Sequence, residues 1–292
     1  MKEYEYSKAP SKGLIDSQLS ELKKDTNKLK NKEVLLQLLN CIDLTSLNTT
    51  DTTEKIKAMT QKVSGFSSNF PQYKNVAAIC VYPSLVPIVK GNLTAKNVKI
   101  AAVGAGFPSS QTFVAVKAAE CELTVHKGAD EIDIVISVGS FLEKNYNKVA
   151  AEIQIIKESI GDAHLKVILE TGELLNTDNI HLASIIAMEA GADFIKTSTG
   201  KTSVSATPEA VYTMCSAIKD YYAKTGRKVG IKPSGGMSVS EDAIIYYQIV
   251  KKVLGNEWLN NKLFRLGASR LANSILTDLN ALEGKKDEIK YF

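Results

Sequence analysis

The chain has 292 residues, of which 44% are hydrophobic and 23% charged, and its formal net charge is +4. This length is enough for one large domain or two small ones. The mildly basic balance, without a long run of arginine and lysine, gives no reason to expect nucleic acid as a partner, whereas it suits small phosphorylated ligands.

Four cysteines lie far apart in the sequence and form no CxxC pair, so we expect neither a disulfide framework nor a cysteine metal site. They are Cys41, Cys80, Cys121 and Cys215. The polar N-terminus lacks the apolar centre of a secretory signal, and no apolar run approaches the roughly 20 residues of a membrane helix. We therefore expect a cytoplasmic protein with no membrane partner.

Residues 1–38 are predicted to form a helical extension ahead of one catalytic domain, residues 39–292. The first 13 residues are polar, and we expect them to be mobile. From Leu14 onward, apolar residues recur at helical spacing, and a second short helix is predicted over 33–40. Such a stripe is typical of an arm or lid that packs on a barrel, although a partner-binding helix would show it too.

From Cys41 the chain alternates between strand-like runs and segments with helical periodicity. Eight runs begin 22 to 35 residues apart, a spacing that suits strand–helix units of a parallel sheet. They are 41–48, 76–83, 98–108, 131–137, 165–172, 194–200, 229–236 and 263–269. Capping-box patterns at 51–54 and 238–241 predict the starts of two helices.

Eight such units favour an α/β TIM (β/α)8 barrel over an open doubly wound sheet. A doubly wound sheet usually has fewer strands and a G-x-G-x-x-G turn after its first strand. Here the first run is followed by SLNTTDT, which contains no glycine. We predict one barrel without a further domain break.

Three runs carry a charged residue where a parallel sheet wants apolar side chains. The residues are Asp133, Lys196 and Lys232. Because side chains alternate along a strand, their apolar neighbours would face the helices and the charged groups would face the barrel interior. Lys196 and Lys232 belong to consecutive runs, so we expect them to lie close together where TIM-barrel sites form.

Two adjacent lysines in a partly dry cavity favour a nucleophilic amine. Each ammonium disfavours the other, and burial disfavours both charges, so the pKa of an amine falls. Such an amine attacks a carbonyl to form a carbinolamine and then an iminium, an electron sink for carbon–carbon cleavage. Asp133, with water, would move the protons. The alternative is a buried ion network that only ties the strands together.

The loops after the last two strands have features of a phosphate site. Gly235 and Gly236 follow the seventh run, and Gly267 and Ser269 lie in the eighth. Glycines there let backbone N–H groups approach an anion, and barrel phosphate sites commonly use these two loops. Lys201 would add a point charge. Ordinary turns are the alternative for each glycine pair alone.

Other titratable residues have less defined roles. Asp43 and Glu170 occupy inward-compatible positions, where each would bind a hydroxyl or pair with a lysine. Cys80 would pack or contact the substrate. The three histidines are expected to lie outside the strands and lack metal-ligand spacing, so we expect no metal ion and no cofactor. They are His126, His164 and His181.

In these runs the sequence strongly resembles the deoxyribose-phosphate aldolases, Schiff-base lyases of the TIM-barrel type. The segments CIDLTSLN, VAAICVYP, GADEIDIVIS, VILETGEL, GADFIKTSTGK, VGIKPSGG and FRLGAS occur in that family's order over residues 40–275. The resemblance implies reversible cleavage of 2-deoxy-D-ribose 5-phosphate to glyceraldehyde 3-phosphate and acetaldehyde, in deoxynucleoside breakdown.

The resemblance also implies residue roles. Lys196 corresponds to the Schiff-base nucleophile, Lys232 to the lysine that perturbs it, and Asp133 to the proton relay. The implied substrate-binding set is Asp43, Cys80, Lys201, Gly235, Gly236, Gly267 and Ser269. Two positions depart from the family pattern. Arg270 stands where some members have a second serine, and Tyr291 is followed by Phe292 where some members end in a tyrosine that enters the site.

Two other interpretations stay open. Another Schiff-base aldolase, such as a transaldolase or keto-acid aldolase, would not use acetaldehyde as its donor. A non-catalytic sugar-phosphate-binding barrel would bind the ligand without releasing an aldehyde. In either case the partners are small molecules, and the chain itself would form a homodimer or a homotetramer.

Overall fold

The structure, a computed structural model, describes residues 8–292. Of the first 13 residues, which were expected to be mobile, 1–7 lie outside this range. Residues 12 and 13 already belong to the first helix, α1 (Lys12–Lys24), because Ser11 caps it by accepting a hydrogen bond from the backbone of Leu14.

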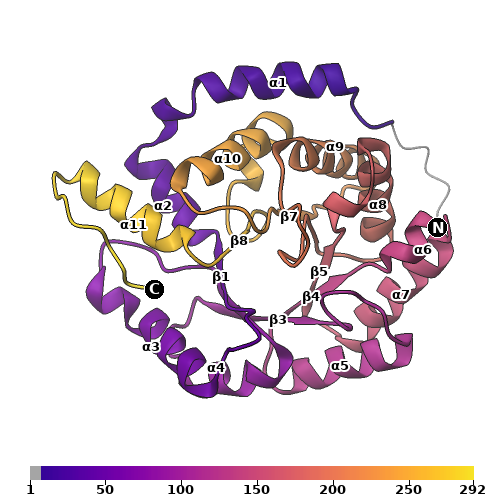
Figure 1. Cartoon of the computed structure of the whole chain (residues 1–292), viewed down its shortest axis with the longest axis horizontal. Coiled ribbons are helices and arrows are strands. Elements are labelled where there is room, and N and C mark those ends of the chain that lie inside the picture. The colour runs from indigo at the N-terminus through magenta and orange to yellow at the C-terminus, as the bar shows by residue number, and fades with distance from the viewer. Residues whose placement is uncertain (1–7) are drawn as a thin grey trace.

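Eight strands, all within the described residues, form the centre of the molecule (Figure 1). They are β1 (Ile42–Thr45), β2 (Ala78–Val81), β3 (Lys99–Gly104), β4 (Glu131–Val135), β5 (His164–Ile168), β6 (Phe194–Lys196), β7 (Gly230–Lys232) and β8 (Leu266–Ala268). Neighbouring strands pair in parallel in the order β7-β6-β5-β4-β3-β2-β1-β8. Bridges Ile231–Phe264 and Ser234–Gly267 close the ring between β7 and β8. The predicted TIM barrel is confirmed.

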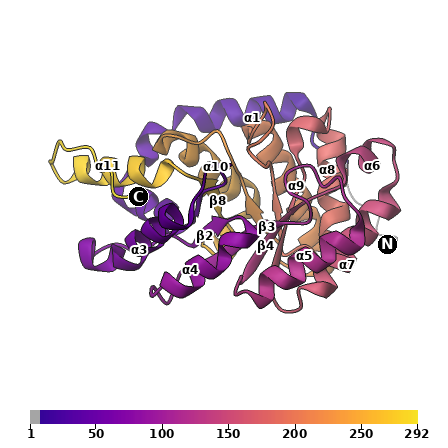
Figure 2. The same ribbon diagram turned by 60° about the horizontal axis from the view of Figure 1, so that its bottom comes forward.

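Helices surround this barrel (Figure 2). After the strands in turn come α3 (Thr53–Asn69), η2 (Pro83–Leu85) with α4 (Val86–Asn92), α5 (Val114–His126), α6 (Val138–Leu142) with α7 (Tyr146–Ser159), η3 (Thr171–Glu173) with α8 (Thr177–Glu189), α9 (Pro208–Thr225), α10 (Ser240–Leu254) with η4 (Asn256–Trp258), and α11 (Leu271–Leu282). The 51–54 pattern predicts a helix start correctly but is wrong by one residue, since Thr52 rather than Asp51 is the cap and accepts from the backbone of Lys55. The 238–241 pattern is wrong by one residue. Val239 takes the cap position, and Asp242 accepts from its backbone N–H.

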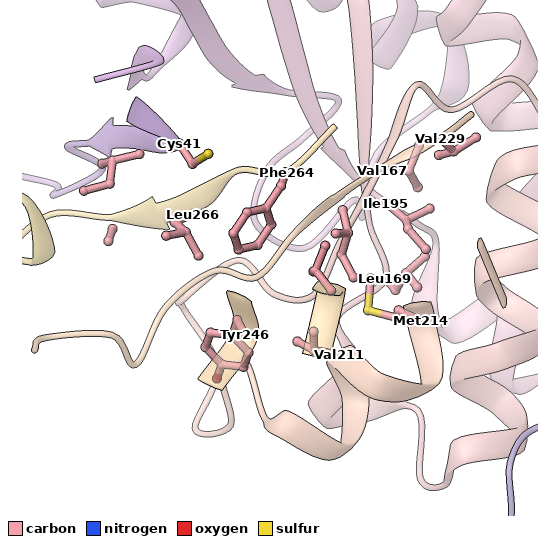
Figure 3. Packing of buried hydrophobic residues seen from close by; sticks show 14 of the residues in the cluster. Cys41, Val167, Leu169, Ile195, Val211, Met214, Val229, Tyr246, Phe264 and Leu266 are labelled. Atoms are coloured by element: carbon pink, nitrogen blue, oxygen red, sulfur yellow. The ribbon is translucent and has the colours of Figure 1, made fainter. Parts of the chain in front are cut away.

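The barrel wall is buried on both faces. Its outward side chains pack against the helices, as Figure 3 shows for Val167, Leu169, Ile195, Val229, Phe264 and Leu266 against Val211, Met214 and Tyr246. Inside, β2 and β3 contribute small or slender apolar residues. The Phe194 ring fills the interior beside β7, where a Cβ on Gly230 would lie 2.3 Å from it, so only glycine fits there.

The N-terminal extension packs along the outside of the barrel. Helix α1 contacts α9 and α10 and buries Ile15 and Leu19, while α2 (Lys32–Asn40) contacts α10 and α11. The two are joined through η1 (Asn27–Leu29). Helix α1 runs across the top of Figure 1 as the predicted arm. The domain boundary after residue 38 stays a prediction and falls inside α2.

Within residues 8–292, no helix combines the length and the apolar character needed to cross a bilayer.

Candidate active site

The interior of the barrel holds a network of charged side chains. Among the described residues it comprises four cations, Lys166, Lys196, Lys232 and Arg265, and three carboxylates, Asp43, Glu131 and Asp133. Each of these side chains is at most 5% exposed. Charges so deeply buried persist only when they are paired or used.

Asp133 lies at the centre of the network. Its Oδ2 accepts from Lys196 Nζ at 2.8 Å and from Lys232 Nζ at 2.7 Å, while its Oδ1 accepts from Lys166 Nζ at 3.0 Å. Lys196 and Lys232 are direct partners in the register of β6 and β7. The alternation of side chains thus brings together the three residues that the sequence singled out.

A second group of ion pairs lies beside the first. Asp43 Oδ2 forms an ion pair with Lys232 Nζ at 2.5 Å, and Asp43 Oδ1 accepts from Arg265 Nη1 at 2.6 Å. Glu131 accepts from Arg265 Nη2 at 2.9 Å and from Lys166 Nζ at 2.5 Å. Asp43 was expected to bind a hydroxyl or hold a lysine. Here it holds Lys232.

Lys166, Glu131 and Arg265 were not among the predicted residues. The signal that identifies them is the same alternation. Glu131 lies two residues before Asp133 on β4, and Arg265 lies two residues before Gly267. Lys166 lies opposite Asp133 in the register of β4 and β5. Extending the inward parity along each strand would have found all three.

The network sets the protonation of Lys196. Burial lowers the pKa of Lys196, the Lys232 charge lowers it further, and Asp133 opposes both. Burial acts on Lys232 too, but the carboxylates of Asp133 and Asp43 outweigh it and raise its pKa. The pKa of Lys166 is likewise raised, because the charges of Asp133 and Glu131 outweigh the effect of burial. Of these lysines, Lys196 is therefore the one that loses its proton most readily.

Counting charges leads to the same conclusion. Four cations against three carboxylates leave one excess positive charge in a medium that penalises it. The carboxylates stay ionised, because the surrounding cations hold the pKa of Asp133, Asp43 and Glu131 below the ordinary range despite burial. The network becomes neutral when Lys196 is an amine.

A pocket of about 270 Å³ opens at the C-terminal ends of the strands. Five of the predicted binding residues line it: Lys201, Gly235, Gly236, Gly267 and Ser269. The pocket also reaches Thr199 and Arg270, and the N-terminus of α11 begins there, so backbone N–H groups face it. Arg270 adds a cation. These groups suit a phosphate.

The remaining predicted residues lie below this pocket or beside it. Asp43 is fully buried in the ion network. Cys80 is fully buried on β2, packed with Leu47 and Val103 among others, and burial raises the pKa of its thiol. Glu170 follows β5 and hydrogen-bonds Thr199 rather than a lysine.

The expectation that the histidines lie outside the strands is wrong for His164, which is the exposed first residue of β5 and pairs with Glu131 in the register of β4. The histidines form no cluster. Within the part of the chain that the structure describes, no group of three or more His, Cys, Asp or Glu side chains is arranged to hold a metal ion. His181 is buried in α8, and burial lowers its pKa.

Comparison with known proteins agrees with this geometry. A family model described as DeoC/LacD family aldolase matches residues 38–252. A relative from Caenorhabditis elegans is 43% identical over 267 residues, which are 91% of this chain and 88% of that protein. The deoxyribose-phosphate aldolase of Homo sapiens is 41% identical over 251 residues, or 82% of this chain and 79% of that protein.

A solved structure supports the fold. The tetrameric deoxyribose phosphate aldolase from Aeropyrum pernix superposes with a TM-score of 0.66 at 24% identity, covering 94% of this chain and 99% of that one. The family match spans most of the barrel, and the relatives span most of the chain. The chain belongs to the DeoC/LacD family of aldolases.

Proposed function

We propose that this lyase is a deoxyribose-phosphate aldolase that cleaves 2-deoxy-D-ribose 5-phosphate reversibly to glyceraldehyde 3-phosphate and acetaldehyde. The human relative with 41% identity carries that name. The observation that carries the proposal is the position of Lys196, whose pKa is lowered in a buried network with one cation more than it has carboxylates.

The first step forms the Schiff base. The Lys196 amine attacks the aldehyde carbon of the open-chain sugar, and a carbinolamine forms as the nitrogen loses a proton and the former carbonyl oxygen takes one up. A second proton converts that hydroxyl to water, which leaves as the iminium forms. Lys232 is the proton donor in this proposal, because its Nζ lies 2.7 Å from the same carboxylate oxygen that Lys196 contacts.

The second step breaks the carbon–carbon bond. Asp133, through a water molecule, removes the proton from the hydroxyl on the second carbon beyond the iminium carbon. That oxygen becomes the aldehyde of glyceraldehyde 3-phosphate as the bond to the intervening carbon breaks, and the bonding electrons pass into the iminium to give an enamine. Protonation of the enamine carbon and addition of water release acetaldehyde and restore the Lys196 amine.

The phosphate occupies the pocket above the network. Lys201 Nζ contacts the carbonyl oxygen of Leu47 at its edge, and the Gly235–Gly236 turn lies opposite. Both glycines have positive φ angles of 77° and 75°, a conformation that turns backbone N–H groups inward at little cost. Ser269, Arg270 and the start of α11 complete the cradle.

Borohydride trapping tests the mechanism. Reduction in the presence of acetaldehyde, followed by peptide mass mapping, should place an ethyl group on Lys196, and Lys196→Ala should abolish cleavage. An adduct on Lys232 would exchange the two lysine roles. Near-normal turnover of Lys196→Ala would refute the assignment. A panel of donors separates the other Schiff-base aldolases, since only this proposal expects acetaldehyde.

A homodimer or homotetramer in the cytoplasm remains our prediction for the assembly and its compartment. The Aeropyrum pernix structure is described as a tetramer. Light scattering of the purified chain distinguishes a monomer from these assemblies.

A further inference from the structure

Glu170 is a buried carboxylate that takes no part in the charged network. It is 3% exposed and follows the end of β5. Its backbone is left-handed, with φ 55° and ψ 59°, although it is not a glycine. This conformation costs free energy for a residue with a side chain, so the surrounding structure must hold it.

A local irregularity between β5 and β6 holds it. The backbone N–H of Leu169 donates to the Lys196 carbonyl, and that of Thr171 donates to the Thr197 carbonyl. From the first of these hydrogen bonds to the second, the donor moves two residues along the chain, from Leu169 to Thr171. The acceptor moves only one, from Lys196 to Thr197. The extra residue is Glu170, which makes this a bulge. Bulges re-aim a side chain, and this one turns the carboxylate along the sheet instead of into the barrel.

The re-aimed carboxylate holds a pocket residue by two hydrogen bonds. Thr199 donates its backbone N–H to Glu170 Oε1 at 3.1 Å and its hydroxyl to Glu170 Oε2 at 2.5 Å. The same hydroxyl oxygen accepts from the backbone N–H of Lys201 at 3.0 Å. The contacts therefore run from Glu170 through Thr199 to the lysine of the pocket, and Thr199, Gly200 and Lys201 all line that pocket.

A packing contact supports the same two loops. A Cβ on Gly172 would lie 2.7 Å from Val204 Cβ, so the loop after β5 presses directly against the loop after β6. Farther along, Ser205 fits against the Gly235 turn, where a Cβ would lie 2.6 Å from its hydroxyl. The loop after β6 is thus held between the loop after β5 and the turn after β7.

We propose that Glu170 is a positioning residue that sets the preference for phosphorylated over unphosphorylated substrates, by fixing the Thr199–Lys201 segment against the phosphate. This inference rests on the proposed function of the pocket. The loop after β5 would then take part in substrate recognition indirectly, because the hydrogen bonds of Glu170 go to Thr199.

The proposal predicts the opposite sign from simple electrostatics. A carboxylate next to a phosphate site repels the ligand, so removing its charge alone would strengthen phosphate binding. If the carboxylate acts by holding Thr199, its removal weakens phosphate binding, because the ligand must then order the loop itself.

Glu170→Gly is the direct test, because glycine keeps the left-handed backbone and removes only the carboxylate. We expect kcat/KM for 2-deoxyribose 5-phosphate to fall by roughly tenfold or more, as expected for lost hydrogen bonds to a charged group. The inhibition constant of inorganic phosphate should rise by a similar factor. For unphosphorylated 2-deoxyribose, kcat/KM should stay within about twofold, since the lysine network is untouched.

Glu173→Gln is the matched control, since it removes an exposed carboxylate three residues along the same loop. It should leave both substrates unchanged. Glu170→Gln keeps the size of the side chain, and it should show a smaller effect in the same direction; it decides the matter if the glycine variant does not fold. Equal losses on both substrates, or tighter phosphate binding, would overturn the proposal.

Lys201→Met separates this inference from the proposed function. If Lys201→Met weakens inhibition by inorganic phosphate while the Glu170 variants do not, the phosphate pocket stands and the role of Glu170 is refuted. If Lys201→Met leaves that inhibition unchanged, the assignment of the pocket itself fails, and the role of Glu170 with it.

Discussion

Lys196 and Lys232 are direct register partners on β6 and β7, and both ammonium groups donate to the same carboxylate oxygen, Asp133 Oδ2. Their pKa values nevertheless move in opposite directions. Burial and the neighbouring ammonium lower the pKa of Lys196, whereas Lys232 has a second carboxylate, Asp43, which helps to raise its own. The difference between the two lysines is the additional carboxylate partner, and it assigns the nucleophile.

Replacing Lys232 should therefore change the pH at which the enzyme becomes active. In Lys232→Met, three cations remain for three carboxylates, and their charges balance only when Lys196 is protonated. The variant also lacks the Lys232 charge, which lowers the pKa of Lys196 in the unmodified protein. The pKa of Lys196 should rise, so the acidic limb of kcat/KM against pH should move to more alkaline pH, with a loss of maximal rate.

The surface variant Lys252→Met is the control for this profile, since it removes the same charge from an exposed position on α10. It should leave the limb in place. A limb that stays fixed or moves to acidic pH in Lys232→Met would show that Lys232 does not hold down the pKa of Lys196.

Stability should distinguish Lys166 from Lys196. Lys166→Met leaves Glu131 and Asp133 each without one buried cation, so the free energy of unfolding should fall by about 3–5 kcal/mol. Lys196→Met removes a side chain that is an amine in the proposed resting state, so the three charged cations and three carboxylates stay matched, and Asp133 keeps two lysines. The free energy of unfolding should then change by less than about 1 kcal/mol, or rise.

Urea unfolding of both variants near pH 7 measures the difference.

The stability should also depend on pH through Lys196. The folded pKa of Lys196 lies below its ordinary value, so the unfolded chain binds more protons in the window between the two values. The stability that neutral Lys196 contributes is therefore present at alkaline pH and is lost as pH falls through that window. Lys196→Met should remove this slope. Equal losses in both variants would contradict the charge count.

The phosphate turn should be sensitive to a single methyl group. Gly235 has a φ of 77°, and an added Cβ would lie 2.6 Å from the Ser205 hydroxyl. Gly226 has a φ of 69° with no atom within 4 Å of such a Cβ. Both alanine variants should lose about 1 kcal/mol of stability from backbone strain. Only Gly235→Ala should also raise KM for the phosphorylated substrate, because Ser205 or the turn must move. A matching KM change in Gly226→Ala would refute this.

The fold was predictable because each strand carries its own signal. Each of the eight strand-like runs overlaps one observed strand. The strands start between one residue before and three residues after the start of the run, and they are shorter because the ends of the runs turn into loops. The inward direction of Asp133, Lys196 and Lys232 followed from the alternation of apolar neighbours. These inferences needed only the local sequence of each run and the assumption of a (β/α)8 barrel.

The rest of the site depended on contacts between distant segments. Arg265 lies between Phe264 and Leu266, and nothing local indicates that its charge finds partners on β1 and β4. The left-handed backbone of Glu170 arises from a mismatch between two strands, which no single run reveals. The position of the Tyr291 side chain was equally hidden, because the partners of its hydroxyl, Asn69 and Lys62, lie more than 200 residues earlier.

Whether Tyr291 enters the site was left open by the resemblance, and the position of the C-terminal tail bears on that question. Here Tyr291 packs edge-on against Phe66 and Phe70 of the α3 region, and its hydroxyl donates to the Lys62 carbonyl at 2.7 Å. Asn273 of α11 accepts from the backbone N–H of Tyr291 and of Phe292. The tail is thus anchored on the outside of the barrel, at α3 and α11.

Tyr291→Phe should therefore lower the free energy of unfolding by about 1–2 kcal/mol, through loss of the hydrogen bonds of its hydroxyl to the Lys62 carbonyl and from the Asn69 amide, and leave kcat unchanged. Asn273→Ala should release the tail and lower stability further, because three hydrogen bonds and the docking of Phe292 on Phe66 depend on it. Urea unfolding and steady-state kinetics of both variants measure the two effects. A large fall in kcat for Tyr291→Phe, without loss of stability, would mean that the tail leaves α3 during turnover and that the hydroxyl acts in the site.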